Sequence, residues 1–289
     1  MNVSSRAAAT LRTLAPAALK PRPRRRPRRA RATPDRVDDT ADDRTVTAAD
    51  AFCALDSGAV TETSLRFAYV WVALGYVAPG AVASALHIDV SDASALDARA
   101  LTTLAVILLA CESAKAAFTV RALERVGANA EFRLDAAGAA RGAAFGVLAA
   151  VLARAVDYAY DAMISRDGAG ASGGSVASFM ASGDVAVVAT TVVASCAVAP
   201  FLEELFFRHF LLRTIEAKTQ SRAVASVVSS AIFAGAHFSA HDVPSLFACG
   251  AVFASAAASS PSFGVSVVAH GVYNASVLIE SSFIHSHSG

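Results

Sequence analysis

Long apolar stretches separated by short polar segments run from residue 65 to residue 284. A membrane-spanning helix needs about 20 mostly apolar residues. Several stretches approach or exceed this length, and the remainder are shorter but apolar throughout. They lie at 65–88, 100–120, 138–160, 184–202, 223–238, 244–260 and 262–284. The pattern therefore predicts an all-α, polytopic integral membrane protein with about seven transmembrane helices.

Polar residues inside the apolar stretches modify this prediction. Glu112 and Lys115 are three residues apart, so they can pair across one helical turn. Charged residues interrupt 138–160, which is also consistent with a tilted or interfacial helix. A soluble, Ala-rich helical bundle is the alternative to a membrane protein. We favour the membrane because several stretches reach spanning length with few charges, and because Ala, Gly and Ser permit close helix packing in lipid.

Composition supports a membrane protein. The chain has 289 residues, of which 55% are hydrophobic and 17% charged, whereas soluble domains carry about 25% charged residues. The net charge of +1 conceals an accumulation of charge in the first 62 residues. We therefore expect the lipid bilayer, and no nucleic acid, as a partner. The four cysteines are far apart and form no CxxC motif, which argues against a disulfide framework or a zinc knuckle.

The N-terminal segment 1–34 is rich in Arg, Ala and Pro and has no acidic residue. This composition is typical of an organelle transit peptide, with a disordered basic tail as the alternative. We expect an acidic disordered linker at 35–62, N-terminal transmembrane helices at 63–160 and a catalytic core at 184–284. The expected location is a chloroplast membrane, with the mitochondrion or the endoplasmic reticulum as alternatives.

The first group of ionisable residues inside an apolar stretch is Glu203, Glu204 and Arg208. Charges at membrane depth are costly, about 2.5–3.5 kcal/mol each, so they usually face a cavity and have a function. Glu204 and Arg208 are four residues apart and can form an ion pair, while Glu203 points elsewhere. The arrangement offers one carboxylate held by arginine and one candidate general base. Taken alone, it also fits a solvated helix end.

Two later stretches carry histidines. Phe233 and His237 are four residues apart, as are His270 and Asn274, so each pair shares a helix face. His270 and Asn274 can both donate hydrogen bonds, which suits the stabilisation of an oxyanion. The alternatives are a satisfied buried histidine and an interhelical polar clamp. Three successive membrane helices with such residues predict one polar cavity within the bilayer.

These residues resemble the type II CAAX prenyl protease family, which includes the CAAX protease and bacteriocin-processing enzymes. Its motifs EExxxR, FxxxH and HxxxN are matched by 203–208, 233–237 and 270–274, although His209 stands where Gly is usual. The resemblance covers about residues 184–280 and implies an all-helical, glutamate-dependent intramembrane endopeptidase. It further implies the following roles: Glu203 and His237 activate water, Arg208 holds Glu204, and His270 and Asn274 bind the oxyanion.

A zinc site is the alternative to a metal-free mechanism. Two histidines and a carboxylate, here His237, His270 and Glu203, could bind zinc with a water molecule in the fourth position. The chain has no HExxH motif, and the histidines lie on separate segments. We therefore expect no cofactor, with zinc as the alternative.

The expected substrate is a membrane-associated protein or peptide. A non-catalytic scaffold, such as an assembly or immunity factor, is the first alternative function. A transporter with a proton relay is the second, although the chain lacks an internal inverted repeat. Substrate prenylation, membrane topology and oligomeric state stay open from the sequence.

Overall fold

A computed structural model describes residues 52–88, 96–130, 132–164, 179–180 and 182–287, and the side chains up to Phe283. The chain divides into two units at residues 44 and 45, and every described residue belongs to the second unit. The expected transit peptide at 1–34 lies outside the described residues. The described part is all-helical and has no strand. The chain therefore has the all-α class of a polytopic membrane protein.

The helical elements follow one another as seven continuous or nearly continuous segments within the described residues. In chain order they are α2 (Ser57–Val72) with η1 (Ala73–Val77) and α3 (Ala78–Ala85); α4 (Ala98–Arg125); α5 (Ala136–Met163); α7 (Val185–Val193) with η3 (Ala194–Val198), α8 (Ala199–Glu204), η4 (Leu205–Leu212) and α9 (Arg213–Thr219); α10 (Arg222–Gly235); α11 (Val243–Ala258); and α12 (Gly264–His287). The η elements are π-helical.

Side-chain caps fix where most of these helices begin. The carboxylates of Asp56, Asp97, Asp135 and Asp184 each accept a hydrogen bond from a backbone N–H in the first turn of α2, α4, α5 and α7. The hydroxyl of Ser221 does the same for α10. Such caps satisfy N–H groups that have no partner within the helix.

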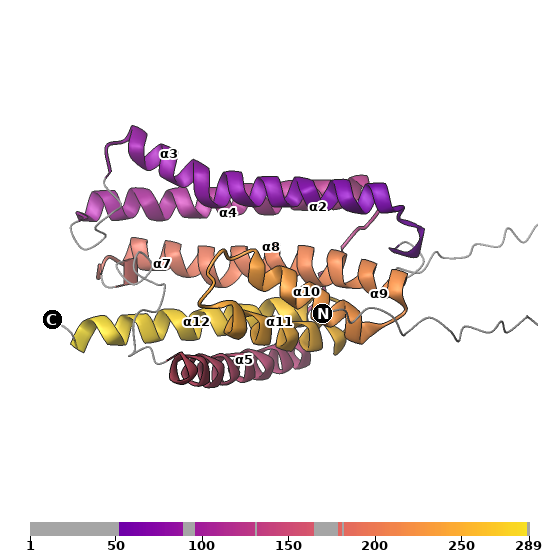
Figure 1. Cartoon of the computed structure of the whole chain (residues 1–289). Helices are drawn as coiled ribbons and strands as arrows, with labels where there is room; N and C mark the ends of the chain where they lie inside the picture. The colour runs from indigo at the N-terminus through magenta and orange to yellow at the C-terminus, as the bar shows by residue number, and fades with distance from the viewer. Residues whose placement is uncertain (1–51, 89–95, 131, 165–178, 181, 288–289) are drawn as a thin grey trace, which may run out of the picture. The chain divides into compact units, whose positions relative to one another are not determined.

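The helices lie roughly alongside one another, with the long α7–α9 helix in the middle (Figure 1). On one side α4 packs against α7 and α8, and it also contacts α2 and α3. On the other side α12 packs against η3 and α8, and α5 packs against both α11 and α12. The helix that carries the two glutamates is therefore enclosed between two groups of helices.

Among the described residues, four helical stretches are long and apolar enough to cross a membrane: Ser57–Ala85, Ala98–Arg125, Ala136–Met163 and Val185–Thr219. Two shorter apolar helices, α10 and α11, accompany them. Only 22% to 28% of each apolar window is buried inside the protein, so most of its apolar surface faces outward. This outward apolar surface is what a lipid bilayer requires, and the chain is an integral membrane protein.

Three glycines on one face of α5 allow α12 to approach closely. A Cβ atom on Gly142 would lie 2.7 Å from Val268 Cβ, and one on Gly146 would lie 2.6 Å from the Ala269 carbonyl oxygen. Gly138 precedes them at the same four-residue spacing. Small residues at this spacing let two helix backbones come together in lipid. The glycine face of α5 thus sets the position of α12, which carries His270.

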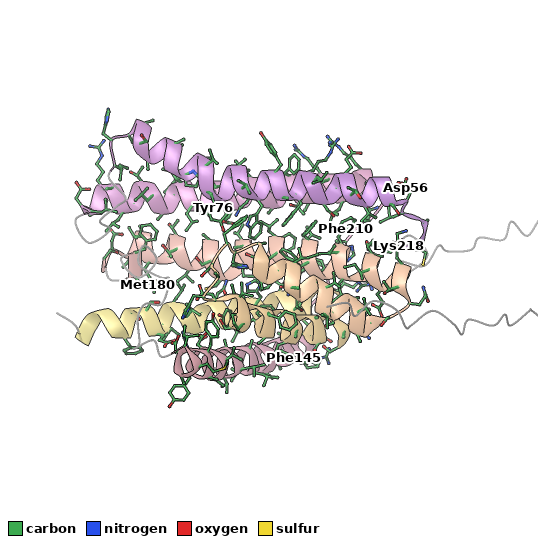
Figure 2. The ribbon with its side chains drawn as sticks, in the orientation of Figure 1. Asp56, Tyr76, Phe145, Met180, Phe210 and Lys218 are labelled. Carbon is green, nitrogen blue, oxygen red and sulfur yellow. The ribbon has the colours of Figure 1, made fainter. Side chains whose placement is uncertain are left out.

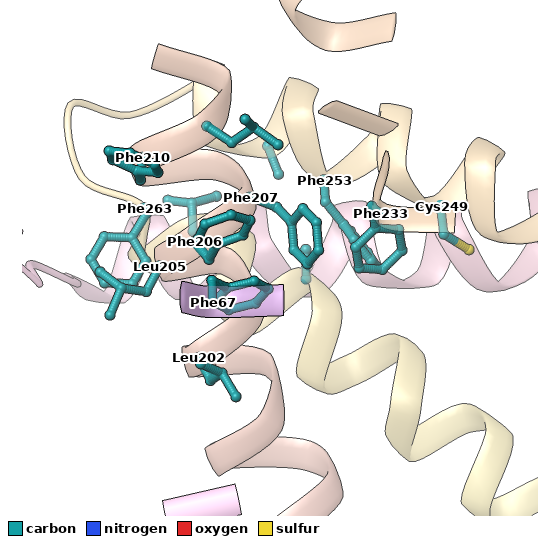
Figure 3. Packing of buried hydrophobic residues seen from close by; sticks show 14 of the residues in the cluster. Phe67, Leu202, Leu205, Phe206, Phe207, Phe210, Phe233, Cys249, Phe253 and Phe263 are labelled. Carbon is teal, nitrogen blue, oxygen red and sulfur yellow. The ribbon is translucent and has the colours of Figure 1, made fainter. Parts of the chain in front are cut away.

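An aromatic cluster packs around the middle of the α7–α9 helix (Figure 3). The rings of Phe67 and Phe206 stack with centroids 3.5 Å apart, and Phe207 meets Phe233 edge-on at 5.3 Å. Phe233 in turn lies 6.1 Å from Phe253. These contacts connect α2, η4, α10 and α11 around the glutamate pair.

The structure differs from the sequence-based prediction at two helix boundaries. The helix expected at 184–202 continues to Thr219, because the π-helical segment η4 carries it past the charged residues. Helix α2 begins at Ser57, inside the segment 35–62 that we expected to be a disordered linker, because Asp56 caps it. Near this end Lys218 donates a hydrogen bond to the Leu55 carbonyl, and Figure 2 shows Lys218 close to Asp56.

Candidate active site

Pro200 shapes the helix that carries the glutamates. Proline has no backbone N–H to donate. The carbonyl of Ser195 would accept from residue 200 in a π-helix, and the carbonyl of Cys196 would do so in an α-helix. Both carbonyls therefore lack that donor. The helix is π-helical just before this point, over Ala194–Val198, and again over Leu205–Leu212. Segments of this kind are frequent at functional sites. Glu203 and Glu204 end α8 between the two π-helical segments.

Glu204 forms the centre of a buried ionic network. Its Oε2 lies 3.2 Å from Arg208 Nε, and both side chains are fully buried. Arg208 Nη1 donates to the Ser229 hydroxyl at 3.1 Å, and that hydroxyl donates to the Phe207 carbonyl at 2.9 Å. The sequence-based prediction that Arg208 pairs with Glu204 is confirmed. Both side chains are held in place by contacts within the protein.

Glu203 has a different environment from its neighbour. Both Oε2 atoms are buried without a hydrogen-bond partner among the described residues, but Glu204 Oε2 has the Arg208 guanidinium at 3.2 Å, in contrast to Glu203 Oε2. Two imidazole nitrogens face this oxygen: His270 Nε2 at 3.8 Å and His237 Nε2 at 4.0 Å. Neither distance is a direct hydrogen bond, and separations of this size are typical of groups bridged by water. Three separate segments thus converge on one carboxylate oxygen.

His270 is fixed from several sides. Its Nδ1 lies 3.1 Å from Glu204 Oε1, so the carboxylate holds the proton on Nδ1 and leaves Nε2 facing Glu203. The ring of Phe253 stacks on the imidazole with centroids 4.6 Å apart and an interplanar angle of 19°. His270 is therefore oriented by both a hydrogen bond and ring packing.

His237 lies just beyond the last residue of α10, within the α10–α11 loop. Its Nδ1 donates to the Phe233 carbonyl at 2.8 Å, which leaves Nε2 facing Glu203. The next residue, Phe238, has a φ of 53°, so the chain turns away from the helix at once. The expected helix over 223–238 thus ends three residues early, while the Phe233–His237 pairing that we predicted is present, with ring centroids 4.8 Å apart.

Asn274 lies one turn along α12 from His270 and contacts the glutamate-bearing helix. Its Nδ2 donates to the Ser195 carbonyl at 2.7 Å, one of the two carbonyls that Pro200 leaves without its helical donor. On the same helix as Asn274, a Cβ on Gly271 would lie 2.4 Å from the carbonyl oxygen of Cys196. This is the second carbonyl that Pro200 leaves without its helical donor. Asn274 thus joins α12 to η3 through one amide hydrogen, and its oxyanion role stays a prediction.

A second buried ion pair lies on α4. Lys115 Nζ is 2.6 Å from Glu112 Oε1 and 4.7 Å from the centre of the Trp71 ring. The indole of Trp71 donates to the Ala236 carbonyl at 3.2 Å, next to His237. The pairing of Glu112 with Lys115, predicted from their spacing, is confirmed, and Trp71 connects the pair to the His237 loop.

The alternative zinc site requires Glu203, His237 and His270 to surround one ion. Within the described residues no group of three or more His, Cys, Asp or Glu side chains is arranged to hold a metal ion. The bond from Nδ1 of His270 to Glu204 does not oppose a metal at Nε2, because metal-ligating histidines commonly donate their other ring N–H to a carboxylate. The expectation of a site without a cofactor, with zinc as the alternative, stays a prediction.

Sequence reasoning missed several residues that hold the site together. Ser229 and Trp71 contribute contacts that span 21 and 165 residues of sequence, so no local pattern indicates them. The glycines of α5 and the prolines did leave a visible signal. Gly138, Gly142 and Gly146 repeat every four residues, and Pro200 comes three residues before the first glutamate.

Comparison with protein families gives a match in the second half of the chain. Residues 185–276 match the family described as type II CAAX prenyl endopeptidase, Rce1-like. The matched range contains all six residues that form or adjoin the site described above, from Glu203 to Asn274. Comparisons with curated proteins and with solved structures gave no match.

Proposed function

We propose that this chain, which carries a domain of the type II CAAX prenyl endopeptidase family over residues 185–276, is a glutamate-dependent intramembrane endopeptidase. The proposal covers the hydrolysis of a peptide bond in a membrane-associated protein or peptide. It rests mainly on one observation. The Oε2 atom of Glu203 is buried, has no hydrogen-bond partner in the described part of the chain, and faces the Nε2 atoms of two histidines from two other segments, at 3.8 and 4.0 Å.

In this proposal Glu203 and His237 activate the attacking water. Glu203 Oε2 accepts a proton from the water as the water oxygen attacks the peptide carbonyl carbon, and the Nε2 atom of His237 orients the water from the other side. When the C–N bond breaks, the protonated Glu203 gives this proton to the leaving amine. The gap of 4.0 Å between these atoms supports a bridging water rather than a direct contact. No step requires a metal ion.

Stabilisation of the tetrahedral oxyanion falls to α12. His270 Nε2 faces the same space as Glu203 and donates to the oxyanion only when the ring carries a second proton, because the proton on Nδ1 is bound to Glu204. Asn274 keeps a second amide hydrogen beyond the one bonded to Ser195. Donors that are already fixed before the reaction stabilise developing negative charge at no cost in reorganisation. Glu204 and Arg208 act indirectly, because they hold His270 in its orientation.

An apolar cavity of about 630 Å³ supports a substrate with a hydrocarbon chain. Its walls come from α2, η4 and α10, and include Trp71, Phe206 and Phe238. Ala236, also in the wall, is the residue before His237. We propose that the apolar part of the substrate lies there while its peptide bond reaches Glu203.

We further propose that residues 1–34 are a transit peptide and that the enzyme works in a chloroplast membrane. The Arg-rich, acid-free composition supports this location. Sequencing the N-terminus of the mature protein from isolated plastids tests it. A mature N-terminus near residues 30–60 supports the proposal, whereas an uncleaved chain in the endoplasmic reticulum contradicts it.

The function is tested with Glu203→Gln, which keeps the size of the side chain but removes the base. The full chain is reconstituted into phosphatidylcholine vesicles with a farnesylated CAAX peptide or an unmodified single-span peptide. We expect cleavage by the wild type, and a loss of about 10²- to 10⁴-fold in kcat for Glu203→Gln.

Glu216→Gln is the matched control, because Glu216 belongs to the same long helix but lies at its exposed end, 4.0 Å from Arg222. It should keep wild-type kcat. Equal activity of the wild type and Glu203→Gln would contradict a glutamate-dependent protease. Absence of cleavage of every peptide by the wild type, with a folded chain, would favour the non-catalytic scaffold.

A further inference from the structure

His241, in the same loop as His237, lies between two carboxylates. Its Nε2 is 2.9 Å from Asp161 Oδ1 near the end of α5, and its Nδ1 is 3.0 Å from Asp242 Oδ1. The ring of Tyr160, also on α5, meets the imidazole edge-on at 5.7 Å. Both imidazole nitrogens can donate only when the ring carries a positive charge. The geometry is therefore that of an imidazolium bridging two helices.

Asp242 is used differently from the other aspartates that precede helices. It occupies the N-cap position of α11, but its side chain makes no capping hydrogen bond. Its Oδ2 instead accepts from the Ser239 hydroxyl at 2.6 Å, while Oδ1 faces His241. Asp56, Asp97, Asp135 and Asp184 all cap their helices. The carboxylate of Asp242 thus serves the loop rather than the helix that follows it.

The loop from Ala236 to Asp242 is attached on two opposite sides. On one side Trp71 donates to the Ala236 carbonyl, and the ring of Tyr76 meets Phe238 edge-on at 5.5 Å. On the other side Asp161 of α5 binds His241. Helix α5 also packs against α12 through its glycine face. One helix therefore supports the segments of both histidines that face Glu203.

We propose that His241 is a positioning residue for His237, and that its bridge between Asp161 and Asp242 holds the α10–α11 loop in the conformation in which His237 faces Glu203. This inference rests on the proposed protease function for its catalytic consequence. The structural consequence, a fixed conformation of the α10–α11 loop, does not depend on the protease function.

Protonation of His241 controls the bridge. The hydrogen bonds to Asp242 and Asp161 raise the pKa of His241 above its usual 6.5. Among the described residues, the ring of Tyr160 and the hydroxyl of Ser239 also contact this cluster. Because the folded pKa is raised, the bridge is complete below pH 6.5 and is lost as the pH rises through the folded pKa. The loop should loosen on the alkaline side.

Hydrogen exchange of residues 236–242, measured on the full chain in lipid nanodiscs and corrected for the intrinsic rate at each pH, tests the bridge directly. Asp161→Asn keeps the shape of the side chain and removes its charge. We expect it to lower protection of the loop about fivefold at pH 6, in line with a partly exposed charge pair. In the wild type, protection of residues 236–242 against hydrogen exchange should be kept at pH 6 and should fall as the pH rises through the folded pKa of His241.

Asp157→Asn is the matched control. Asp157 lies one turn earlier on α5 and pairs with Arg154 at 3.5 Å, so this variant removes the same charge from the same helix without touching the loop. It should keep wild-type protection at every pH. Wild-type protection in Asp161→Asn, or equal loss in both variants, would overturn the inference.

The catalytic consequence is measured with the peptides that the wild type cleaves. Asp161→Asn should lower kcat about tenfold at unchanged KM, because a displaced His237 no longer orients the water. It should also move the alkaline limb of the pH–kcat profile to lower pH, which a purely structural role would not do. If Asp161→Asn leaves both kcat and the alkaline limb of the pH–kcat profile unchanged, His241 does not position His237. If no peptide is cleaved but loop protection behaves as expected, the protease proposal fails while the bridge stands.

Discussion

The two histidines that face Glu203 are supported in different ways. His270 lies inside α12, its side chain is 4% exposed, and it is held by Glu204 and by the stacked ring of Phe253. His237 lies in a loop just after α10, its side chain is 28% exposed, and its Nδ1 is held by a backbone carbonyl. The two reach the same oxygen at nearly equal distances.

The difference indicates that the two histidines contribute differently to the stability of the protein. A buried histidine bonded to a buried carboxylate is part of the protein's stability, because removing it leaves Glu204 Oε1 without its donor. His237 is more exposed and is bonded only to a backbone carbonyl, so it contributes less to stability, and its position depends on the contacts that hold the loop. We infer that α12 supplies the rigid wall of the site and that the α10–α11 loop supplies its adjustable wall.

Replacing each histidine by Phe gives the largest expected effect and tests this difference. Both variants should lose about 10²- to 10⁴-fold in kcat, because each removes a polar group from the reacting space. Only His270→Phe should also lose stability, by about 1–3 kcal/mol for the unsatisfied glutamate. Thermal unfolding in detergent, followed by circular dichroism, separates the two, and equal melting temperatures would contradict the difference.

Asn274→Ala tests the rigid wall further along α12. If the amide also serves the oxyanion, kcat should fall about 10²-fold. The lost bond to Ser195 should lower stability by only about 0.6 kcal/mol, the average for such bonds in membranes. A small change in both quantities would mean that Asn274 is solely a clamp between α12 and η3.

Gly146→Ala tests whether the glycine face of α5 sets the position of the rigid wall. The added Cβ would lie 2.6 Å from the Ala269 carbonyl oxygen, next to His270. We expect a loss of about 1–3 kcal/mol from overpacking and a smaller loss of kcat than in the histidine variants. Gly80→Ala is the control, because a Cβ at Gly80 meets nothing within 4 Å. Unfolding in urea compares them, and equal midpoints would show that the close approach is unimportant.

Much of the fold was readable from the sequence. The apolar stretches marked the helices because a bilayer demands long apolar segments. The four-residue spacings indicated that Glu204 pairs with Arg208 and that Phe233 approaches His237, because residues four apart share a helix face. Both pairings are present. Boundaries were less predictable, since the cap at Asp56 and the π-helical segment η4 depend on local hydrogen bonding.

The sequence by itself determined which residues are candidates for the chemistry and which of them lie on one helix face, because these are properties of spacing along one segment. Only the tertiary structure decided that His270 binds Glu204 across 66 residues, that Asn274 takes a carbonyl exposed by Pro200, and that Asp161 holds His241. These contacts join helices far apart in the chain. They depend on how closely α5 and α12 approach and on where the α10–α11 loop turns, which no spacing within a single helix records.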